Sequence, residues 1–226
     1  MGFFTIIRVL LPRARPIAVL FDLDGTLVDT VPFILEAVRH AFDGYGRCPT
    51  DAEWIAGIGT PLRTQLADFA RSPTDVEPLF QRYRAYWLAH HDDRTRAFPG
   101  ALEVVRALRE AGHPIGIVTA KIEQGALRSL AHTGLLPYVT GVVGADSCEN
   151  AKPHPEPVLL ALSRVGRPPT EALLLGDSPH DLAAARAAGA IAVAASWGAC
   201  PREVLAPHAD HVLADVRELP ALVASI

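Results

Sequence analysis

From Pro16 onward, short apolar runs alternate with amphipathic segments, and this alternation limits the fold more than any other feature of the sequence. Apolar runs joined by segments with helical periodicity are typical of a parallel sheet whose two faces are both covered by helices. We therefore expect an α/β protein with a Rossmann-like, doubly wound parallel sheet. The expected strands are 17–21, 115–118, 139–143, 172–175, 191–194 and 211–213, and the expected helices between them are 99–112, 123–132, 158–165 and 182–188.

One segment breaks this rhythm, because residues 30–97 contain no convincing strand. Helical patterns lie at about 33–42, 62–70 and 76–91, and several glycines and prolines separate them. The simplest interpretation is a small all-helical domain, residues 30–97, inserted after the first strand. Residues 1–29 and 98–226 would then form the α/β core domain.

Polar side chains lie in four of the connections that follow strands of the predicted sheet. Asp22 and Asp24 come directly after the first strand, Thr119 follows the second, Lys152 lies in the loop after the third, and Asp177 and Asp181 follow the fourth. Ligands of α/β sheets bind beyond the carboxyl ends of the strands. We therefore expect these side chains to meet at one edge of the sheet.

Such a cluster of carboxylates predicts a bound cation, because crowded carboxylates repel one another unless a cation is present. Oxygen ligands without a histidine or cysteine cluster favour a hard ion such as Mg²⁺. Lys152 adds a positive charge that suits a second anion, for which phosphate is a good candidate. Backbone N–H groups of the Gly25–Thr26 turn and of the helix after Lys121 could bind that anion.

Four segments of the chain resemble, in order, the four motifs of haloacid dehalogenase-type phosphatases. They are Phe21-Asp22-Leu23-Asp24-Gly25-Thr26-Leu27-Val28-Asp29-Thr30, Ile117-Val118-Thr119, Lys152-Pro153-His154-Pro155-Glu156-Pro157 and Gly176-Asp177-Ser178-Pro179-His180-Asp181. A single Asp-x-Asp is a weak signal, whereas four ordered motifs at predicted strand ends are a strong one. The similarity runs from about Ile17 to Leu219 and is greatest to phosphoglycolate phosphatase-like members with a helical cap.

The resemblance implies a role for each motif residue. Asp22 would be the nucleophile that forms an aspartyl-phosphate, and Asp24 would be the general acid and base. Asp22 and Asp177 would hold Mg²⁺ together with the backbone carbonyl of Asp24. Asp181 would contact the ion either directly or through another ligand. Thr119 would bind a phosphate oxygen, and Lys152 would offset the negative charge of nucleophile and phosphate.

The substrate site is less well defined by the resemblance. Gly25, Thr26 and Ala120 are the other expected phosphate contacts, but close relatives often have Asn where this chain has Ala120, so a side-chain contact is missing there. The helical insert would be the cap that covers the site. Its Gly57–Arg63 segment resembles a substrate loop, which makes Arg63 a candidate for a second anionic group. Lys121 is expected to be a solvated residue of a first helical turn.

Other functions on the same fold are possible. A haloacid dehalogenase would lack the second aspartate of the first motif, which is present here as Asp24. A phosphomutase of the β-phosphoglucomutase type would use Asp22 and Asp24 in the same way, and a non-catalytic binder would have lost a motif residue. Among phosphatases, the substrate stays open between phosphoglycolate-like monoesters, pyrophosphate, nucleotides and sugar phosphates.

Composition narrows the partners and the location. The net charge of −4 and the absence of a basic run argue against nucleic-acid binding. The apolar Met1–Leu11 stretch is too short to span a membrane and lacks a signal cleavage site, so a loosely packed extension is expected. Three scattered cysteines predict free thiols in the cytoplasm. Of the 21 lysines and arginines, two are lysines, Lys121 and Lys152, so a compact ammonium is expected to matter there.

Overall fold

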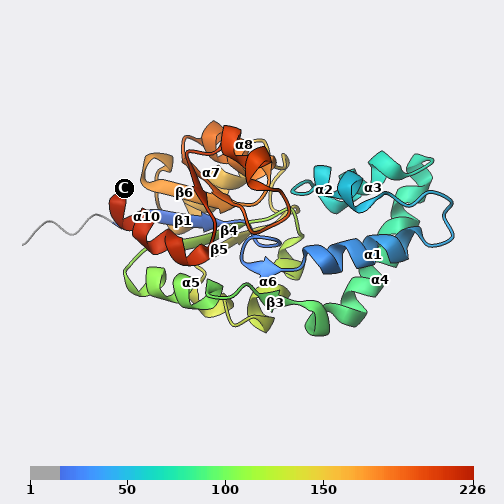
Figure 1. Ribbon diagram of the computed structural model, residues 1–226, viewed down its shortest axis with the longest axis horizontal. Helices are drawn as coiled ribbons and strands as arrows, with labels where there is room; N and C mark the ends of the chain where they lie inside the picture. Colours follow the sequence, from blue (N-terminus) through green and yellow to red (C-terminus); the bar gives the residue numbers. More distant parts are fainter. Residues whose placement is uncertain (1–15) are drawn as a thin grey trace, which may run out of the picture.

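A six-stranded parallel sheet is the centre of the fold (Figure 1). The computed structural model describes residues 16–226, so the extension expected before the first strand lies outside the described residues. The strand order is β5-β4-β1-β6-β7-β8. The strands are β1 (Ala18–Phe21), β4 (Ile115–Val118), β5 (Gly141–Val143), β6 (Ala172–Gly176), β7 (Ile191–Ala195) and β8 (His211–Leu213).

Helices cover both faces of this sheet, as expected for a doubly wound fold. Alternate residues of β1 divide between two cores: Val19 and Phe21 belong to one, Ala18 and Leu20 to the other. The first core is closed by α5 (Ala101–Glu110), α6 (Glu123–His132) and α10 (Leu219–Ser225), and the second by α7 (Glu156–Val165), α8 (Pro179–Ala188) and α9 (Arg202–Leu205). Figure 1 shows α7 and α8 on one side of the sheet and α5 and α10 on the other.

The strand order places the ends of β1, β4 and β6 next to one another. The chain moves outward from β1 to β4 and β5, then returns to β6 on the other side of β1 and continues to β7 and β8. Such a reversal opens a crevice at the carboxyl ends of the strands, where ligands of these folds bind. The motif residues that follow these three strands are therefore brought to one place.

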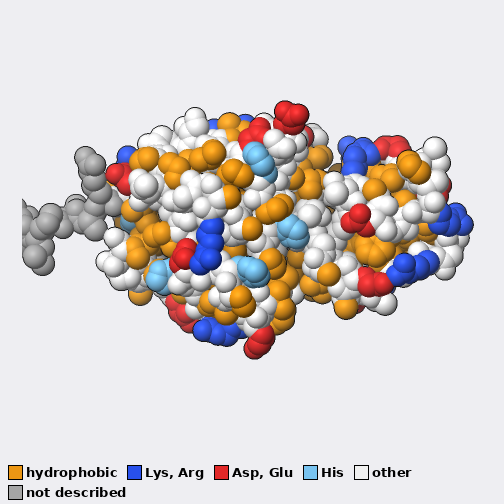
Figure 2. All heavy atoms as spheres, turned by 90° about the horizontal axis from the view of Figure 1, so that it is seen from above, with side chains coloured by type: hydrophobic (Ala, Val, Ile, Leu, Met, Phe, Trp, Pro, Cys, Tyr) orange, Lys and Arg blue, Asp and Glu red, His pale blue; other side chains and the backbone are white. Residues whose placement is uncertain are grey.

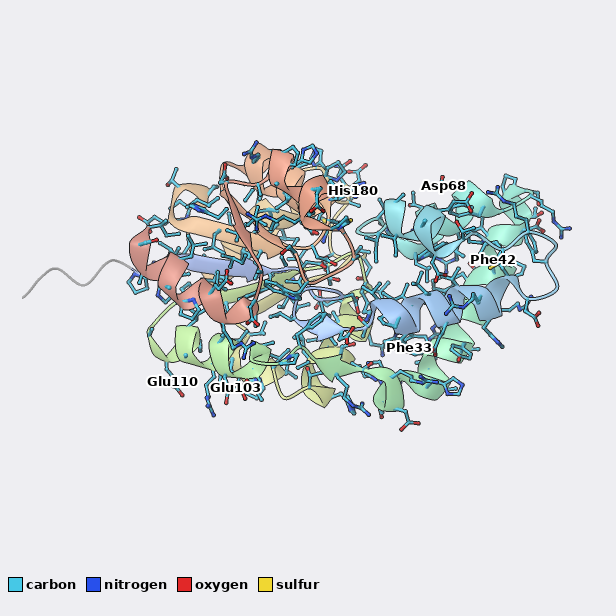
Figure 3. The ribbon with its side chains drawn as sticks, in the orientation of Figure 1. Phe33, Phe42, Asp68, Glu103, Glu110 and His180 are labelled. Atoms are coloured by element: carbon cyan, nitrogen blue, oxygen red, sulfur yellow. The ribbon has the colours of Figure 1, made fainter. Side chains whose placement is uncertain are left out.

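Four helices form a separate lobe beside the sheet, with their own apolar core (Figure 1). They are α1 (Val31–Phe42), α2 (Asp51–Ala56), α3 (Leu62–Phe69) and α4 (Val76–Arg94). Phe33 and Phe42, labelled in Figure 3, belong to that core together with Trp54, Tyr83 and Trp87. We call this lobe the helical insert. Its proposed limits as a domain, residues 30–97, stay a prediction.

Two features of the insert were not expected from the sequence. Helix α2 begins at a capping box, in which the Thr50 hydroxyl accepts from the N–H of Glu53. The chain also enters and leaves the insert through a short antiparallel ribbon of β2 (Val28–Asp29) and β3 (Arg96–Ala97). A two-residue strand has too little alternation to be seen in a sequence.

The α/β fold class expected from the sequence is confirmed. Among residues 16–226, no helix combines the length and apolar character needed to cross a membrane. Charged side chains of both signs are scattered over the face drawn in Figure 2, rather than gathered in a patch of one sign.

Candidate active site

Asp22 and Lys152 form a buried ion pair at the centre of the site. Asp22 comes directly after β1 and is 5% exposed, and Lys152 lies in the loop between β5 and α7 and is 4% exposed. The Lys152 Nζ donates to Asp22 Oδ1 at 2.8 Å, to Asp181 Oδ1 at 2.5 Å and to the Val118 carbonyl at 3.1 Å. All three protons of the ammonium are thus directed at acceptors, which fixes its position between the first and fourth motifs.

Asp181 is held from its other side by the start of α8. The Ser178 hydroxyl donates to Asp181 Oδ2 at 2.5 Å, and the Ser178 N–H donates to the same oxygen at 3.1 Å. The Ser178 oxygen also accepts from the Asp181 N–H, which completes the helix cap. One side chain therefore caps α8 and binds Lys152.

Asp177 occupies a space that two glycines leave open. A Cβ atom on Gly25, whose φ is +84°, would lie 2.0 Å from Asp177 Oδ2, and a Cβ on Gly198 would lie 2.4 Å from the same oxygen. That oxygen accepts from the Ala199 N–H at 2.7 Å, while Oδ1 accepts from the Thr26 hydroxyl at 3.4 Å. Gly25 and Thr26 thus border the carboxylate cluster, and Gly198 was missed by the sequence analysis as part of the site.

Asp22, Asp177 and Asp181 make a group that fits a divalent cation. One oxygen of each carboxylate lies within 4.8 Å of the others, and all three residues are buried. Burial and the neighbouring carboxylates raise the pKa of Asp22 to about 7 and that of Asp177 well above its ordinary value, although Lys152 acts in the opposite direction on both. One ammonium thus incompletely balances three buried carboxylates. Oxygen ligands with surplus negative charge are the donor set that Mg²⁺ prefers.

We expect the metal-free protein to lose stability as the pH rises from about 4 to about 7. Asp22 binds a proton over this range in the folded state but not in the unfolded state, because its folded pKa lies above the ordinary value of 3.8. The effect of this group on the free energy of unfolding is roughly 2–4 kcal/mol, or a shift in Tm of about 5–10 °C. Added Mg²⁺ should therefore raise Tm more at pH 8 than at pH 5.

Thermal unfolding with and without Mg²⁺ at both pH values measures this effect. The Asp22→Asn protein is the comparison, because it cannot bind the proton and should show a flatter pH dependence. Equal pH dependence in the two proteins would contradict the raised pKa of Asp22.

Asp24 is held by a second lysine on the other side of the site. Its Oδ1 accepts from the Thr30 hydroxyl at 2.6 Å and from the Lys121 Nζ at 2.7 Å. The Lys121 side chain is 14% exposed, so the expectation of a solvated first-turn residue is wrong. Its pairing with Asp24 was not predicted, because Lys121 matches none of the motif roles. The available signal was that the chain uses arginine almost everywhere else.

Thr119 and Ala120 border a small pocket with Lys152. Thr119 is buried at the end of β4, and its hydroxyl oxygen accepts from the Lys121 N–H at 3.2 Å. Gly59 of the helical insert also lines this pocket. Ala120 therefore lies at the pocket with no polar side chain, as the sequence departure implied.

The loop after α2 reaches the site, but Arg63 does not join it. His180, labelled in Figure 3 where α8 faces the insert, lies with its Nδ1 3.1 Å from the Ile58 carbonyl. A Cβ on Gly59 would lie 2.6 Å from the Ser178 hydroxyl. Arg63 instead pairs with Glu77 of α4, and its guanidinium lies 3.6 Å from the centre of the Phe80 ring. Its role in binding substrate stays a prediction.

Comparisons with known proteins agree with this geometry. Residues 19–195 match the profile of the family described as haloacid dehalogenase-like hydrolase. The pyrophosphatase PpaX of Bacillus pumilus is 36% identical over 207 residues, which are 91% of this chain and 95% of the relative. A hydrolase from Pseudomonas syringae superposes with a TM-score of 0.84 at 25% identity, covering 93% of this chain and 99% of that one.

A protein described as a predicted phosphoglycolate phosphatase, from Haemophilus somnus, has the same fold, with a TM-score of 0.82 at 22% identity over 92% of this chain and 98% of that one. The resemblance drawn from the four motifs is confirmed, and so is the expectation of an enzyme of the phosphatase class. The chain belongs to the haloacid dehalogenase-like hydrolase family.

Proposed function

We propose that the protein is a Mg²⁺-dependent phosphatase that forms an aspartyl-phosphate on Asp22. The observation that supports this most strongly is the buried pair of Asp22 and Lys152 beside two further carboxylates. A carboxylate held at the end of a strand, next to a fixed ammonium and a cation site, can approach an anionic phosphate that would otherwise repel it.

Asp22 and Asp177 would hold the Mg²⁺, with Asp181 and the backbone carbonyl of Asp24 as its other protein partners. When bound, the ion would neutralise charge on the phosphoryl oxygens. Whether Asp181 contacts the ion directly or through another ligand, it also binds Lys152, because its Oδ1 accepts a hydrogen bond from the ammonium.

The residues of the site divide the reaction between them. An Asp22 oxygen forms a bond to phosphorus as the bond to the leaving oxygen breaks, and Asp24 gives that oxygen its proton. Asp24 then takes a proton from the water whose oxygen displaces Asp22 from phosphorus. The Lys152 ammonium stabilises the charge on the phosphoryl group in both steps, and Thr119 with the Gly25–Thr26 turn would bind its oxygens.

The substrate we propose is a small phosphate compound, with inorganic pyrophosphate and phosphoglycolate as the two candidates. Pyrophosphate is supported by relatives named pyrophosphatase that match over nine-tenths of this chain. Phosphoglycolate is supported by the sequence resemblance of the motifs and of the Gly57–Arg63 loop. The helical insert would act as the cap, because its Ile58–Gly59 loop contacts the fourth motif at His180 and Ser178.

The other functions find less support. A dehalogenase would have no use for a second aspartate fixed by two hydrogen bonds, as Asp24 is. A phosphomutase needs an insert that binds the second phosphate of a bisphosphate, and Arg63, the candidate for such a contact, is paired with Glu77. The three cysteines are free thiols, which suits the reducing cytoplasm, where we place the enzyme.

Phosphate release with and without Mg²⁺ tests the proposal. The panel is pyrophosphate, phosphoglycolate, p-nitrophenyl phosphate, a sugar phosphate and a nucleotide. We expect release that depends on Mg²⁺ and strongly favours pyrophosphate or phosphoglycolate. Folded protein that releases no phosphate from any of them in Mg²⁺ would overturn it.

A further inference from the structure

A chain of polar contacts runs from Asp24 into the helical insert. The Lys121 Nζ, bound to Asp24, also lies 3.4 Å from the Ser129 hydroxyl of α6. That hydroxyl lies 3.0 Å from His91 Nε2, and His91 Nδ1 lies 2.6 Å from Asp92 Oδ1. His91 and Ser129 are both fully buried, although they belong to the insert and to the sheet domain respectively.

The chemistry of these groups fixes the direction of each hydrogen bond. An ammonium can only donate, so the Ser129 oxygen accepts from Lys121. Asp92 Oδ1 can only accept from His91 Nδ1, so in a neutral ring Nε2 has no proton and accepts the hydroxyl proton of Ser129. His91 Nδ1 then carries the ring proton and donates it to Asp92. This requires a neutral imidazole, and burial lowers the pKa of His91 in agreement.

The order Ser129, His91 and Asp92 is that of a hydrolase triad, but this serine cannot be a nucleophile. Its side chain is completely buried, so no substrate reaches it. Its oxygen is also occupied as an acceptor for Lys121. The trio therefore serves to hold Lys121 rather than to attack a substrate.

The surroundings of Lys121 are shaped to a compact ammonium. The Lys121 Nζ lies over the Trp87 ring, 5.0 Å from its centre, and Trp87 belongs to the same insert helix as His91. A Cβ atom on Gly125 would lie 3.1 Å from Lys121 Cγ, so the glycine leaves room for the lysine stem. Among the described residues, Thr30 and Lys121 both donate to Oδ1 of the Asp24 side chain. Its Oδ2 is therefore the oxygen that can exchange a proton with the substrate.

We propose that Ser129 and His91 are positioning residues for acid–base catalysis, which hold Lys121 against Asp24 and couple the last insert helix to that carboxyl group. The proposal rests on the proposed function, in which Asp24 exchanges protons with the leaving group. Without the Ser129 hydroxyl, the Lys121 ammonium loses one of its contacts and holds the Asp24 carboxyl group less firmly, while the Thr30 hydroxyl still binds it.

The leaving group of the substrate provides the test. An alkyl phosphate such as phosphoglycolate needs a proton on its departing oxygen, whereas p-nitrophenolate departs with little help. We expect Ser129→Ala to lower kcat for phosphoglycolate, or for another alkyl phosphate if that is the better substrate, by about tenfold or more. The kcat for p-nitrophenyl phosphate should change by less than about twofold.

Three variants separate positioning from a structural fault. Thr133→Val removes the hydroxyl of the residue that follows α6, which donates to the backbone carbonyls of Ser129 and Leu130 only, so it should change neither rate. His91→Leu should act like Ser129→Ala, and His91→Gln should recover part of the loss because its amide oxygen can accept from Ser129. Equal losses for both substrates, or no loss, would overturn the proposal while leaving the phosphatase intact.

A measurement without substrate checks the same contact. With two lysines in the chain, protein labelled with ¹⁵N at Nζ gives at most two side-chain ammonium signals in NMR spectra. In Ser129→Ala the Lys121 signal should exchange with water faster, whereas in Thr133→Val it should not. An unchanged Lys121 signal would overturn the proposal, and a wild-type protein without phosphatase activity would overturn it together with the proposed function.

Discussion

The Asp22→Asn protein is expected to fold normally and to release phosphate at less than about one-thousandth of the wild-type rate. An amide is a far poorer nucleophile than a carboxylate. Lys152 also binds Asp181, but among the described residues Asp22 is the one carboxylate that both follows β1 directly and contacts Lys152. Stability should not suffer, because burial raises the pKa of Asp22 and the charged form is costly in the folded protein. Phosphate release at saturating substrate and thermal unfolding measure the two effects.

The matched control is Asp29→Asn, the same substitution at an exposed carboxylate of β2. It should leave the rate within about twofold of the wild type, as expected for a surface change. Rapid quenching of the wild-type reaction followed by mass spectrometry should detect phosphate on the peptide that contains Asp22. Turnover above about one-tenth of the wild-type rate in pure Asp22→Asn protein would exclude the aspartyl-phosphate route.

The sheet and the central carboxylates could be predicted because they depend on one regular pattern. A strand buried on both faces is a continuous apolar run, and in a parallel sheet each run ends at the same edge. Asp22, Thr119 and Asp177 each follow such a run, so their positions in the chain already place them together. Strands β4 and β8 have the limits expected from the sequence.

The pair of Lys121 and Asp24 could not be predicted in this way. Lys121 precedes a helix and Asp24 follows a strand, and their contact depends on how the loop after β4 packs against the insert. The Lys121 side chain packs against the Trp87 ring and beside Gly125, which lie in different elements. Periodicity within one segment carries no information about such contacts. The rarity of lysine was the one sign that this position is unusual.

Arg63 shows the opposite limit of sequence reasoning. The loop that contains it was identified by resemblance, and its Ile58–Gly59 part does lie at the site. Which residue of a loop faces the site depends on the helix that follows, and α3 directs Arg63 toward Glu77 of α4. The side chain that selects the substrate is therefore harder to read from a sequence than the side chains that carry out the reaction.

Lys152→Met is expected to cost both activity and stability. Methionine keeps most of the length of the side chain but removes the three hydrogen bonds to Asp22, Asp181 and the Val118 carbonyl. Breaking a buried ion pair from one side costs about 3–5 kcal/mol, and losing a group that stabilises charge in a transition state costs about 10²–10³ in kcat. We therefore expect a metal-free protein at pH 8 whose Tm is lower by about 10 °C, and turnover reduced at least a hundredfold.

The loss of stability should be smaller at pH 5 than at pH 8. Lys152 lowers the pKa of Asp22, so its removal lets Asp22 bind a proton more readily, and protonation relieves the repulsion among the carboxylates. Mg²⁺ should restore part of the Tm at pH 8, because it supplies positive charge to the same three carboxylates. Arg186→Met is the control, since it removes an exposed ion pair with Asp210 and should cost at most about 1 kcal/mol. If Lys152→Met lowers Tm at pH 8 no more than this control does, the ammonium is not what balances the buried carboxylates, and the charge arrangement proposed for catalysis is wrong.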